Sequence, residues 1–534
     1  MILQALVDYY ETLAGQGRIA RPGWADLRVS FALEIDADGC LLQVHPLKSD
    51  RGDGKKPQPR VMTLPAIGEQ KGSGIKSNFL WENSSYLLGF DGKGNPKRAK
   101  DCFSAAKDLH IALLDKLDDP FARAICGFFN TWNTEAAGEH PEIAAYKEDI
   151  EKGANLVFLF DGKFPNENGA LSQAWQNYYD GDEEGGVLMR CLVTGQKVAP
   201  ALIHPAVKGV RDAQPSGASL VSFNTLAACS YGREQNLNAP VGKYAAFAYT
   251  AALNQLLSDR GHVKHMGDTT LVYWAQDGET AYQEAFSGIL DGGEEGKMTD
   301  EDLDSFMKEI VQGNSANWEG IPIDPENRFF VLGISPNAAR LSVRFFLRST
   351  FGGFVQNIKE HYACLDIASD GRNRWKNGHI PLWLLLRETV NEKSNDKSAS
   401  PQMSGDTLRA ILTGCPYPAT LYQQTQLRIR AEKKITQGRA AIVKAYLLRN
   451  TNQDEYKEVL QVELNDSTCY QPYVLGRLFS VAEAIQEKAS GVTSIKDKYF
   501  SSACSSPALI FPLVLNLADK HLKKLDGGIR TYYA

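Results

Sequence analysis

The stretch LRVSFALEIDADGCLLQV (residues 27–44) alternates apolar and polar side chains on both sides of a turn sequence, Asp36 to Gly39. A period of two is typical of a strand with one buried face, and an Asp/Gly-rich tetrapeptide between two such runs is typical of a turn. The sequence therefore predicts a β-hairpin. A helix is expected before it, at the start of the chain.

Helical and extended patterns alternate farther along the chain without strict strand–helix–strand order. Apolar spacing is helical over residues 99–132, whereas ANLVFLF (154–160) and TTLVYW (269–274) have the composition of strands. We therefore expect an α+β fold, with a mixed, largely antiparallel β-containing N-terminal body and a C-terminal helical bundle.

The segment VNEKSNDKSASPQ (390–402) is polar and lacks aromatic residues, which is typical of a linker. We expect an α+β body over residues 1–395, a linker over 396–402 and a basic helical bundle over 403–534. Within the bundle, helical periodicity covers residues 406–411, 419–450, 471–490 and 510–524.

Charge is unevenly distributed along the chain. The net charge is −6, but residues 403–534 contain 17 Lys+Arg and 12 Asp+Glu, and so carry +5 against −11 for the rest. Six basic residues form a group that we call the basic stripe: Arg428, Arg430, Lys433, Lys434, Arg439 and Lys444. Arg449 follows just beyond this group. Such stripes often follow phosphates, although an ordinary solvated helix face explains the pattern equally well.

Composition also excludes several classes of protein. The longest apolar run, residues 507–518, is short of the roughly 20 residues that a membrane span needs. The N-terminus has acids and tyrosines where a signal peptide would be basic and then apolar, so we expect a cytoplasmic protein. Nine cysteines form no CxxC pair, which favours reduced structural thiols over a zinc site.

The first candidate contact segment, the motif loop, covers residues 71–83. Its glycines would allow backbone N–H groups to approach an anion, but neither Walker nor GxGxxG spacing is present, so we expect no nucleotide cofactor. Amides and lysines beside aromatics can read or stack on bases; a surface loop that packs Phe79 and Trp81 inward is the alternative. The candidate DNA-contacting residues are Lys71, Gly72, Gly74, Lys76, Ser77, Asn78 and Asn83.

The second candidate segment, the amide loop, covers residues 222–238 and precedes a predicted helix after Pro240. Amides this dense need partners if they are buried, and a loop before a helix N-terminus can meet phosphate or bases. An internally satisfied structural loop is the alternative. The candidate nucleic-acid or subunit contacts are Asn224, Tyr231, Arg233, Gln235, Asn236 and Asn238.

Catalytic signals are weak. His262 and His265 near Asp268 could ligate a metal, but they occur in an expected loop without the HExxH helix. Ser230 is not in a GxSxG elbow. We expect no catalytic residues and no bound metal.

Five ordered motifs carry a family resemblance: ILQALVDYYETL (2–13), GSGIKSNFLWENSSYLLG (72–89), SFNTLAACSYGREQNLNAPVGKYAAFAYTAALN (222–254), GDTTLVYWA (267–275) and FFVLGISPNAARLSVRFF (329–346). Together they resemble the large subunit of type I-C CRISPR-Cas surveillance complexes, known as Cascade. The resemblance implies a non-enzymatic subunit of an RNA-guided antiviral complex.

That resemblance implies recognition of the protospacer-adjacent motif in duplex DNA, help in forming the R-loop, a hold on the displaced strand and recruitment of a helicase-nuclease. The implied partners are guide RNA, target DNA, backbone and 5′-end-binding Cascade subunits, and small helical subunits, which such systems translate separately from the same message. Met403 directly after the linker is a possible start. Two alternatives are a metal-dependent nuclease of a defence system and a general single-strand-binding protein.

Overall fold

The computed structural model describes residues 1–49, 58–66, 74–90, 95–181, 187–223, 225–293, 299–368, 379–395, 398–451, 454–492 and 494–533. The chain divides into two compact units. Unit 1 comprises Met1–Gly209, Ala213–Ser258 and Asn337–Leu341, and unit 2 comprises Val210–Asp212, Asp259–Pro336 and Ser342–Ala534. Of the predicted linker 396–402, residues 396 and 397 lie outside the described residues, and Pro401 and Gln402 begin helix α13, Pro401–Thr413, instead. Independent folding of residues 403–534 stays a prediction.

Unit 1 contains two small sheets, with strand orders β3-β2-β7-β6 and β1-β5-β4. All their pairs are antiparallel except β2 with β7, which is parallel. The strands are β1 Trp24–Val29, β2 Phe31–Ile35, β3 Leu41–Pro46, β4 Lys48–Ser49, β5 Gln58–Pro65, β6 Trp81–Glu82 and β7 Leu156–Leu159. A separate hairpin joins β8 Met189–Arg190 to β9 Lys197–Val198.

The predicted hairpin is confirmed as β2 and β3. Asp36 Oδ1 accepts from the backbone N–H of Cys40 at 2.8 Å, which closes the turn. Gly39 has φ +87°, and a Cβ there would lie 2.1 Å from the backbone N of Phe128. The turn therefore requires glycine both for its conformation and for its close approach to a helix.

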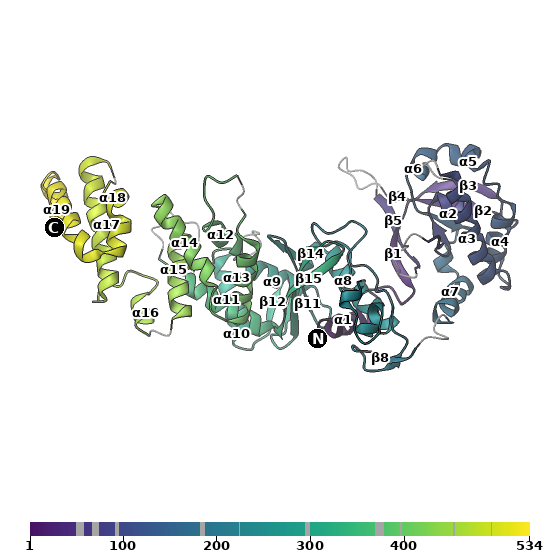
Figure 1. The fold of residues 1–534 in the computed structure, drawn as a ribbon, viewed down its shortest axis with the longest axis horizontal. Helices are drawn as coiled ribbons and strands as arrows, with labels where there is room; N and C mark the ends of the chain where they lie inside the picture. The colour runs from purple at the N-terminus through teal and green to yellow at the C-terminus, as the bar shows by residue number, and fades with distance from the viewer. Residues whose placement is uncertain are drawn as a thin grey trace. The chain divides into compact units, whose positions relative to one another are not determined.

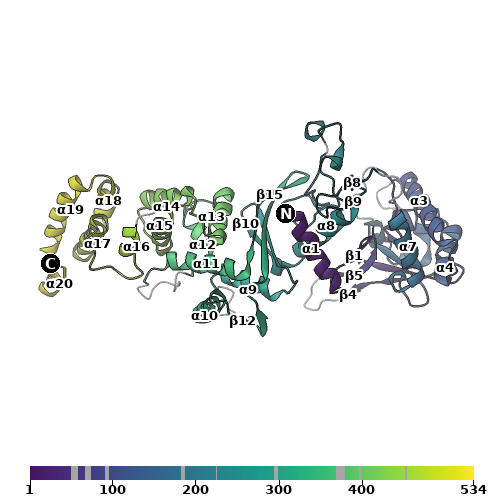
Figure 2. The same cartoon turned by 90° about the horizontal axis from the view of Figure 1, so that it is seen from below.

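The helices of unit 1 are α1 Ile2–Gly15, α2 Ser84–Leu87, α3 Pro96–Leu114, α4 Pro120–Thr131, α5 Pro141–Ala144, α6 Lys147–Glu151, α7 Gly169–Gly181 and α8 Lys243–Ser258. The first helix packs along α8, with the Tyr10 ring 5.8 Å from that of Phe247 (Figures 1 and 2). A separate core places Phe31 and Leu33 of β2 among Phe128 and Phe129 of α4.

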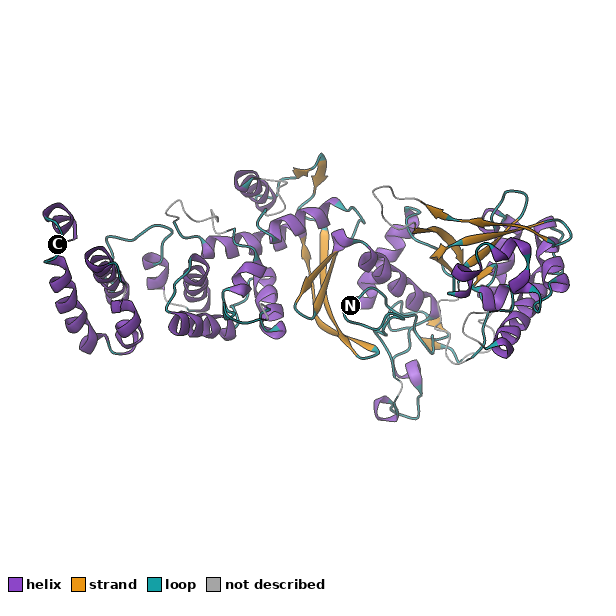
Figure 3. Cartoon of the chain, turned by 90° about the horizontal axis from the view of Figure 1, so that it is seen from above, coloured by secondary structure: helices purple, strands orange, loops and turns teal. Residues whose placement is uncertain are grey.

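Unit 2 contains a four-stranded sheet in the order β10-β11-β14-β15 (Figure 3). Residues Asn337–Leu341, around the turn between its last two strands, belong to unit 1. Strand β11 is buried along its whole length. The strands of this region are β10 Val263–Met266, β11 Thr269–Ala275, β12 Ala316–Trp318, β13 Ile321–Ile323, β14 Arg328–Asn337 and β15 Arg340–Thr350.

Helices make up the rest of unit 2 and share two cores. One core joins Leu271 and Phe354 to Met403 and Ile442, so α13 and α15 pack with the sheet and α11. The other joins α17, α18 and α19 through Phe479, Ile495 and Val514, among others. The helices are α9 Ala281–Leu290, α10 Asp300–Val311, α11 Phe351–Leu365, α12 Leu382–Arg387, α13 Pro401–Thr413, α14 Ala419–Glu432, α15 Gln437–Asn450, α16 Asp454–Val459, α17 Gln471–Ser490, α18 Ser494–Ser505, α19 Pro507–Leu522 and α20 Gly527–Tyr533.

The predicted α+β class, with antiparallel sheets towards the N-terminus and helices towards the C-terminus, is confirmed. The periodic segment 419–450 is divided into α14 and α15, because Lys433 adopts φ +51° and Thr436 Oγ1 accepts from the N–H of Arg439 at 3.1 Å to begin the second helix. In the described part of the chain, no helix has the length and apolar character to cross a bilayer.

Candidate nucleic-acid and subunit interface

The motif loop lies partly outside the described residues, which exclude Lys71 and Gly72. Gly74 and Lys76 are exposed. Ser77 is buried, and its hydroxyl donates to the carbonyl of Asn78 at 2.8 Å. The described end of the loop therefore turns from solvent into the interior within four residues.

The two asparagines of the motif loop have partners within the chain. Asn78 Nδ2 donates to Glu82 Oε1 at 2.8 Å, and the backbone N–H of Asn83 donates to Glu82 Oε2 at 2.9 Å. Asn83 Oδ1 also accepts from the N–H of Ser85 and caps α2. Because Glu82 is buried, these two hydrogen bonds help to compensate the cost of removing its carboxylate from water. Both amides brace the loop.

The aromatic side chains of the motif loop point inward. The ring of Phe79 stacks at 5.1 Å on His110 and at 5.6 Å on Trp175, and Trp81 Nε1 donates to the carbonyl of Pro65. His110 Nε2 accepts from the N–H of Leu80 at 2.8 Å. Inward packing of Phe79 and Trp81, the alternative that the sequence left open, is confirmed.

The amide loop contains two 3-10 turns, Leu226–Ala228 and Gln235–Asn238, and Asn224 lies outside the described residues. Asn238 holds the loop together: its Oδ1 accepts from the N–H of Ser230, and its Nδ2 donates to the carbonyls of Arg233 and Gln235. Tyr231 and Gln235 have positive φ angles, and the hydrogen bonds of Asn238 stabilise the loop in this conformation. Tyr231, Arg233 and Gln235 are exposed.

A cavity of about 470 Å³ lies beside the amide loop. Its lining includes Leu202, Ile203, His204, Leu226 and Asn236. His204 and Asn236 are both buried, and their atoms Nε2 and Oδ1 have no hydrogen-bond partner among the residues that the structure describes. Burial lowers the pKa of His204 to about 4, so the ring is neutral near pH 7.

The basic stripe divides between the surface and the interior. Arg430 and Lys434 are exposed, and Lys433 is half-buried with Nζ donating to the carbonyl of Asp497. Arg428 is mostly buried and lies 3.6 Å from Glu432. Of the six residues of the basic stripe, Arg430 and Lys434 are thus the ones whose side chains stay exposed.

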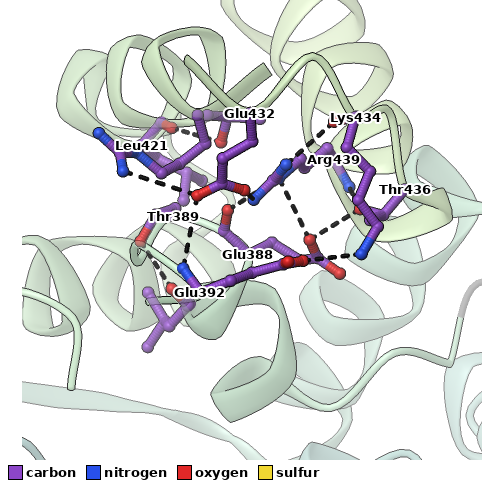
Figure 4. Close-up of polar contacts among 11 residues, drawn as sticks. Glu388, Thr389, Glu392, Leu421, Glu432, Lys434, Thr436 and Arg439 are labelled. Atoms are coloured by element: carbon purple, nitrogen blue, oxygen red, sulfur yellow. Dashed lines mark hydrogen bonds and ion pairs between the residues drawn. The ribbon is translucent and has the colours of Figure 1, made fainter. Parts of the chain in front are cut away.

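The sequence led us to expect Arg439 and Lys444 in an exposed groove. This prediction is wrong, because both side chains are buried. The side chain of Arg439 is 1% exposed and is bracketed by the carboxylates of Glu388 and Glu432 (Figure 4). It also donates to the carbonyls of Glu388 and Lys434. Lys444 is buried as well, and its Nζ donates to the carbonyl of Asp366. These internal acceptors compensate the buried charges.

The paired histidines are separated by their secondary structure. His262 ends a 3-10 turn and is buried, with Nδ1 3.1 Å from the carbonyl of Tyr273. His265 lies in strand β10, so the predicted loop is wrong at this position. Among the described residues, no group of three or more His, Cys, Asp or Glu side chains is arranged to hold a metal ion.

Comparison with known proteins gives the chain a family. A family model described as CRISPR-associated protein (Cas_Csd1) matches residues 6–534. The chain belongs to this family. A search of curated proteins finds no match. Membership in Cas_Csd1 supports a CRISPR-associated, Cascade-type role, which agrees with the resemblance carried by the five sequence motifs.

For this Cas_Csd1 chain, the sequence did not predict that residues 202–204 line the cavity beside the amide loop. These residues lie outside the asparagine-rich motif and carry no motif of their own. A signal for the burial of Arg439 was present, because small residues surround it in QGRAAIVKA (437–445) and place it on the same helix face as Ile442. No comparable signal identifies Glu388 as its partner.

Proposed function

We propose that this chain is the non-catalytic large subunit of a type I-C RNA-guided antiviral complex. In this role it recognises the protospacer-adjacent motif, helps to open the duplex and hold the displaced strand, and recruits the helicase-nuclease. The observation that carries the proposal is the Cas_Csd1 match over residues 6–534. In other RNA-guided effectors the guide reads the target sequence by base pairing and the protein reads the adjacent motif, and the proposed role is analogous.

Two surfaces support the proposal. Gly74 and Lys76 are exposed on a loop whose buried end is fixed by Asn78 and Asn83, so lysine and backbone groups can approach DNA from a rigid base. Arg430 and Lys434 are exposed on and just after α14, where they can follow the phosphates of a displaced strand.

The test is copurification of the chain with guide RNA and the other subunits, followed by binding to duplexes that differ only in the adjacent motif. We expect motif-dependent binding without cleavage. Binding that ignores the motif would indicate a general single-strand-binding protein, and metal-dependent cleavage by the purified chain would contradict a non-catalytic subunit.

A further inference from the structure

Large apolar side chains are exposed around the cavity beside the amide loop. Leu226 is 87% exposed and Tyr231 is 98% exposed, the two highest values for large apolar side chains in the described part of the chain. Leu202 and Ile203, which line the cavity together with Leu226, are 51% and 60% exposed, whereas Tyr231 lies on the same loop outside the lining. An apolar rim of this kind around a cavity is typical of a protein-binding surface.

The wall of the cavity also contains unsatisfied polar atoms. His204 Nδ1 lies 2.7 Å from the Tyr249 hydroxyl. In the described part of the chain, His204 Nε2 and Asn236 Oδ1 have no hydrogen-bond partner. Both atoms are inaccessible to solvent in the isolated chain. A bound group could form hydrogen bonds with them once the two side chains rotate towards the cavity. An amide suits the pair, because its N–H can donate to Asn236 while its oxygen or second N–H meets either tautomer of His204.

The charge of the lining argues against nucleic acid in this cavity. The lining residues, all of them described, include the carboxylate of Glu234 and contain no lysine or arginine. Arg233 is exposed on the same loop but does not line the cavity. A nucleotide would bring its phosphate towards an acidic group without a neutralising cation, whereas a peptide carries no such charge.

We propose that the cavity is the docking site for an extended segment of a protein partner. The segment places an Asn or Gln side chain in the cavity and an adjacent apolar side chain against Leu202, Ile203 and Leu226. The inference rests on the proposed function in taking this partner to be another subunit of the complex. It therefore assigns a protein contact, rather than a nucleic-acid contact, to the cavity side of the amide loop.

To test this, peptides that bind the purified full-length chain are selected from a library of random dodecapeptides. The affinity of a selected peptide is then measured for the chain and for variants of the chain. We expect a consensus of Asn or Gln beside apolar residues. Ile203→Asp and Asn236→Leu should each weaken binding on the order of tenfold or more. Because Asn236→Leu removes an unpartnered buried acceptor, its melting temperature should be no lower than that of the parent chain.

Leu42→Asp is the matched control, since Leu42 of β3 is 52% exposed and lies outside the cavity lining. It should leave peptide binding unchanged. If Asn236→Leu does not fold, the exposed Ile203→Asp variant still decides the outcome. Failure to select any peptide that responds to Ile203→Asp would overturn the proposal. A labelled mixed-sequence single-stranded oligonucleotide whose binding responds to that variant would overturn it in favour of a nucleobase.

The outcome is separable from that of the proposed function. A chain that copurifies with guide RNA but selects no cavity-dependent peptide contradicts the docking site alone. A chain that selects the peptide but copurifies with no guide RNA contradicts the proposed function alone.

Discussion

Asn78 and Asn83 both direct a hydrogen-bond donor at the carboxylate of Glu82, one through its side chain and the other through its backbone. A buried carboxylate depends on such donors, so these residues are fixed by an internal requirement before any contact with DNA. Among the described residues of the motif loop, Gly74 and Lys76 are the exposed ones, and Lys76 is the one that carries a charge.

Asn78→Ala should therefore lower the free energy of unfolding by roughly 1–3 kcal/mol, because it leaves one oxygen of Glu82 without the amide donor. Urea denaturation measures this loss. Lys76→Ala is the control: it should change stability by no more than about 0.5 kcal/mol while weakening DNA binding. An Asn78→Ala protein of normal stability that no longer distinguishes adjacent motifs would instead show that Asn78 reads a base.

His110 makes the stability of unit 1 sensitive to pH. Burial lowers its pKa from 6.5 to about 4, and its Nε2 accepts from Leu80 N–H, so the folded chain holds it neutral. The unfolded chain binds a proton below about pH 6.5, so stability should fall as the pH decreases from 6.5 to 4, by up to about 3 kcal/mol from this group. Denaturation at several pH values tests this: His110→Gln should flatten the slope, and an unchanged slope would contradict the assignment.

At the level of elements, α12, α14 and α15 are joined by one buried guanidinium. Arg439 lies just after the break between α14 and α15, and its partners Glu432 and Glu388 come from α14 and from the end of α12 (Figure 4). The break in the predicted long helix thus brings three elements around one cation.

Arg439→Ala should destabilise the chain by about 3–5 kcal/mol, because the carboxylates of Glu388 and Glu432 would lose the cation that they share. Thermal unfolding measures the effect. Adding Glu388→Gln and Glu432→Gln should restore part of the loss by removing the uncompensated charge. Equal stability of the single and triple variants would contradict this account.

The exposed members of the basic stripe should behave differently. Arg430→Glu combined with Lys434→Glu should lower stability by no more than about 1 kcal/mol, because the Lys434–Glu392 ion pair that it breaks is exposed. It should weaken single-stranded DNA binding and reduce its salt slope by about 1.4. Lys457→Glu, at an exposed position of α16, is the control. A salt slope equal to that of the unmodified chain would remove these residues from the strand-binding surface.

At the scale of the whole molecule, residues 403–534 contain both an independent core and part of a shared one. Helices α17 to α19 pack on one another, whereas Met403, Leu408 and Ile442 pack with residues of the sheet and of α11. Expressed alone, residues 403–534 should be helical but expose this apolar surface of α13 and α15, and should associate into oligomers. Circular dichroism with light scattering checks this, and a helical monomer that binds no hydrophobic dye would contradict it.

The sequence by itself determined the α+β class, the hairpin of β2 and β3, most helices of the C-terminal part and the family resemblance. These features depend on local periodicity, turn residues and ordered motifs, all of which can be read within short windows. The tertiary structure alone decided that Arg439 is buried, since the Glu388 carbonyl that it bonds comes from 51 residues away. The cavity between residues 202–204 and the amide loop is likewise a result of the tertiary structure. No local sequence pattern specifies which distant side chains will come into contact.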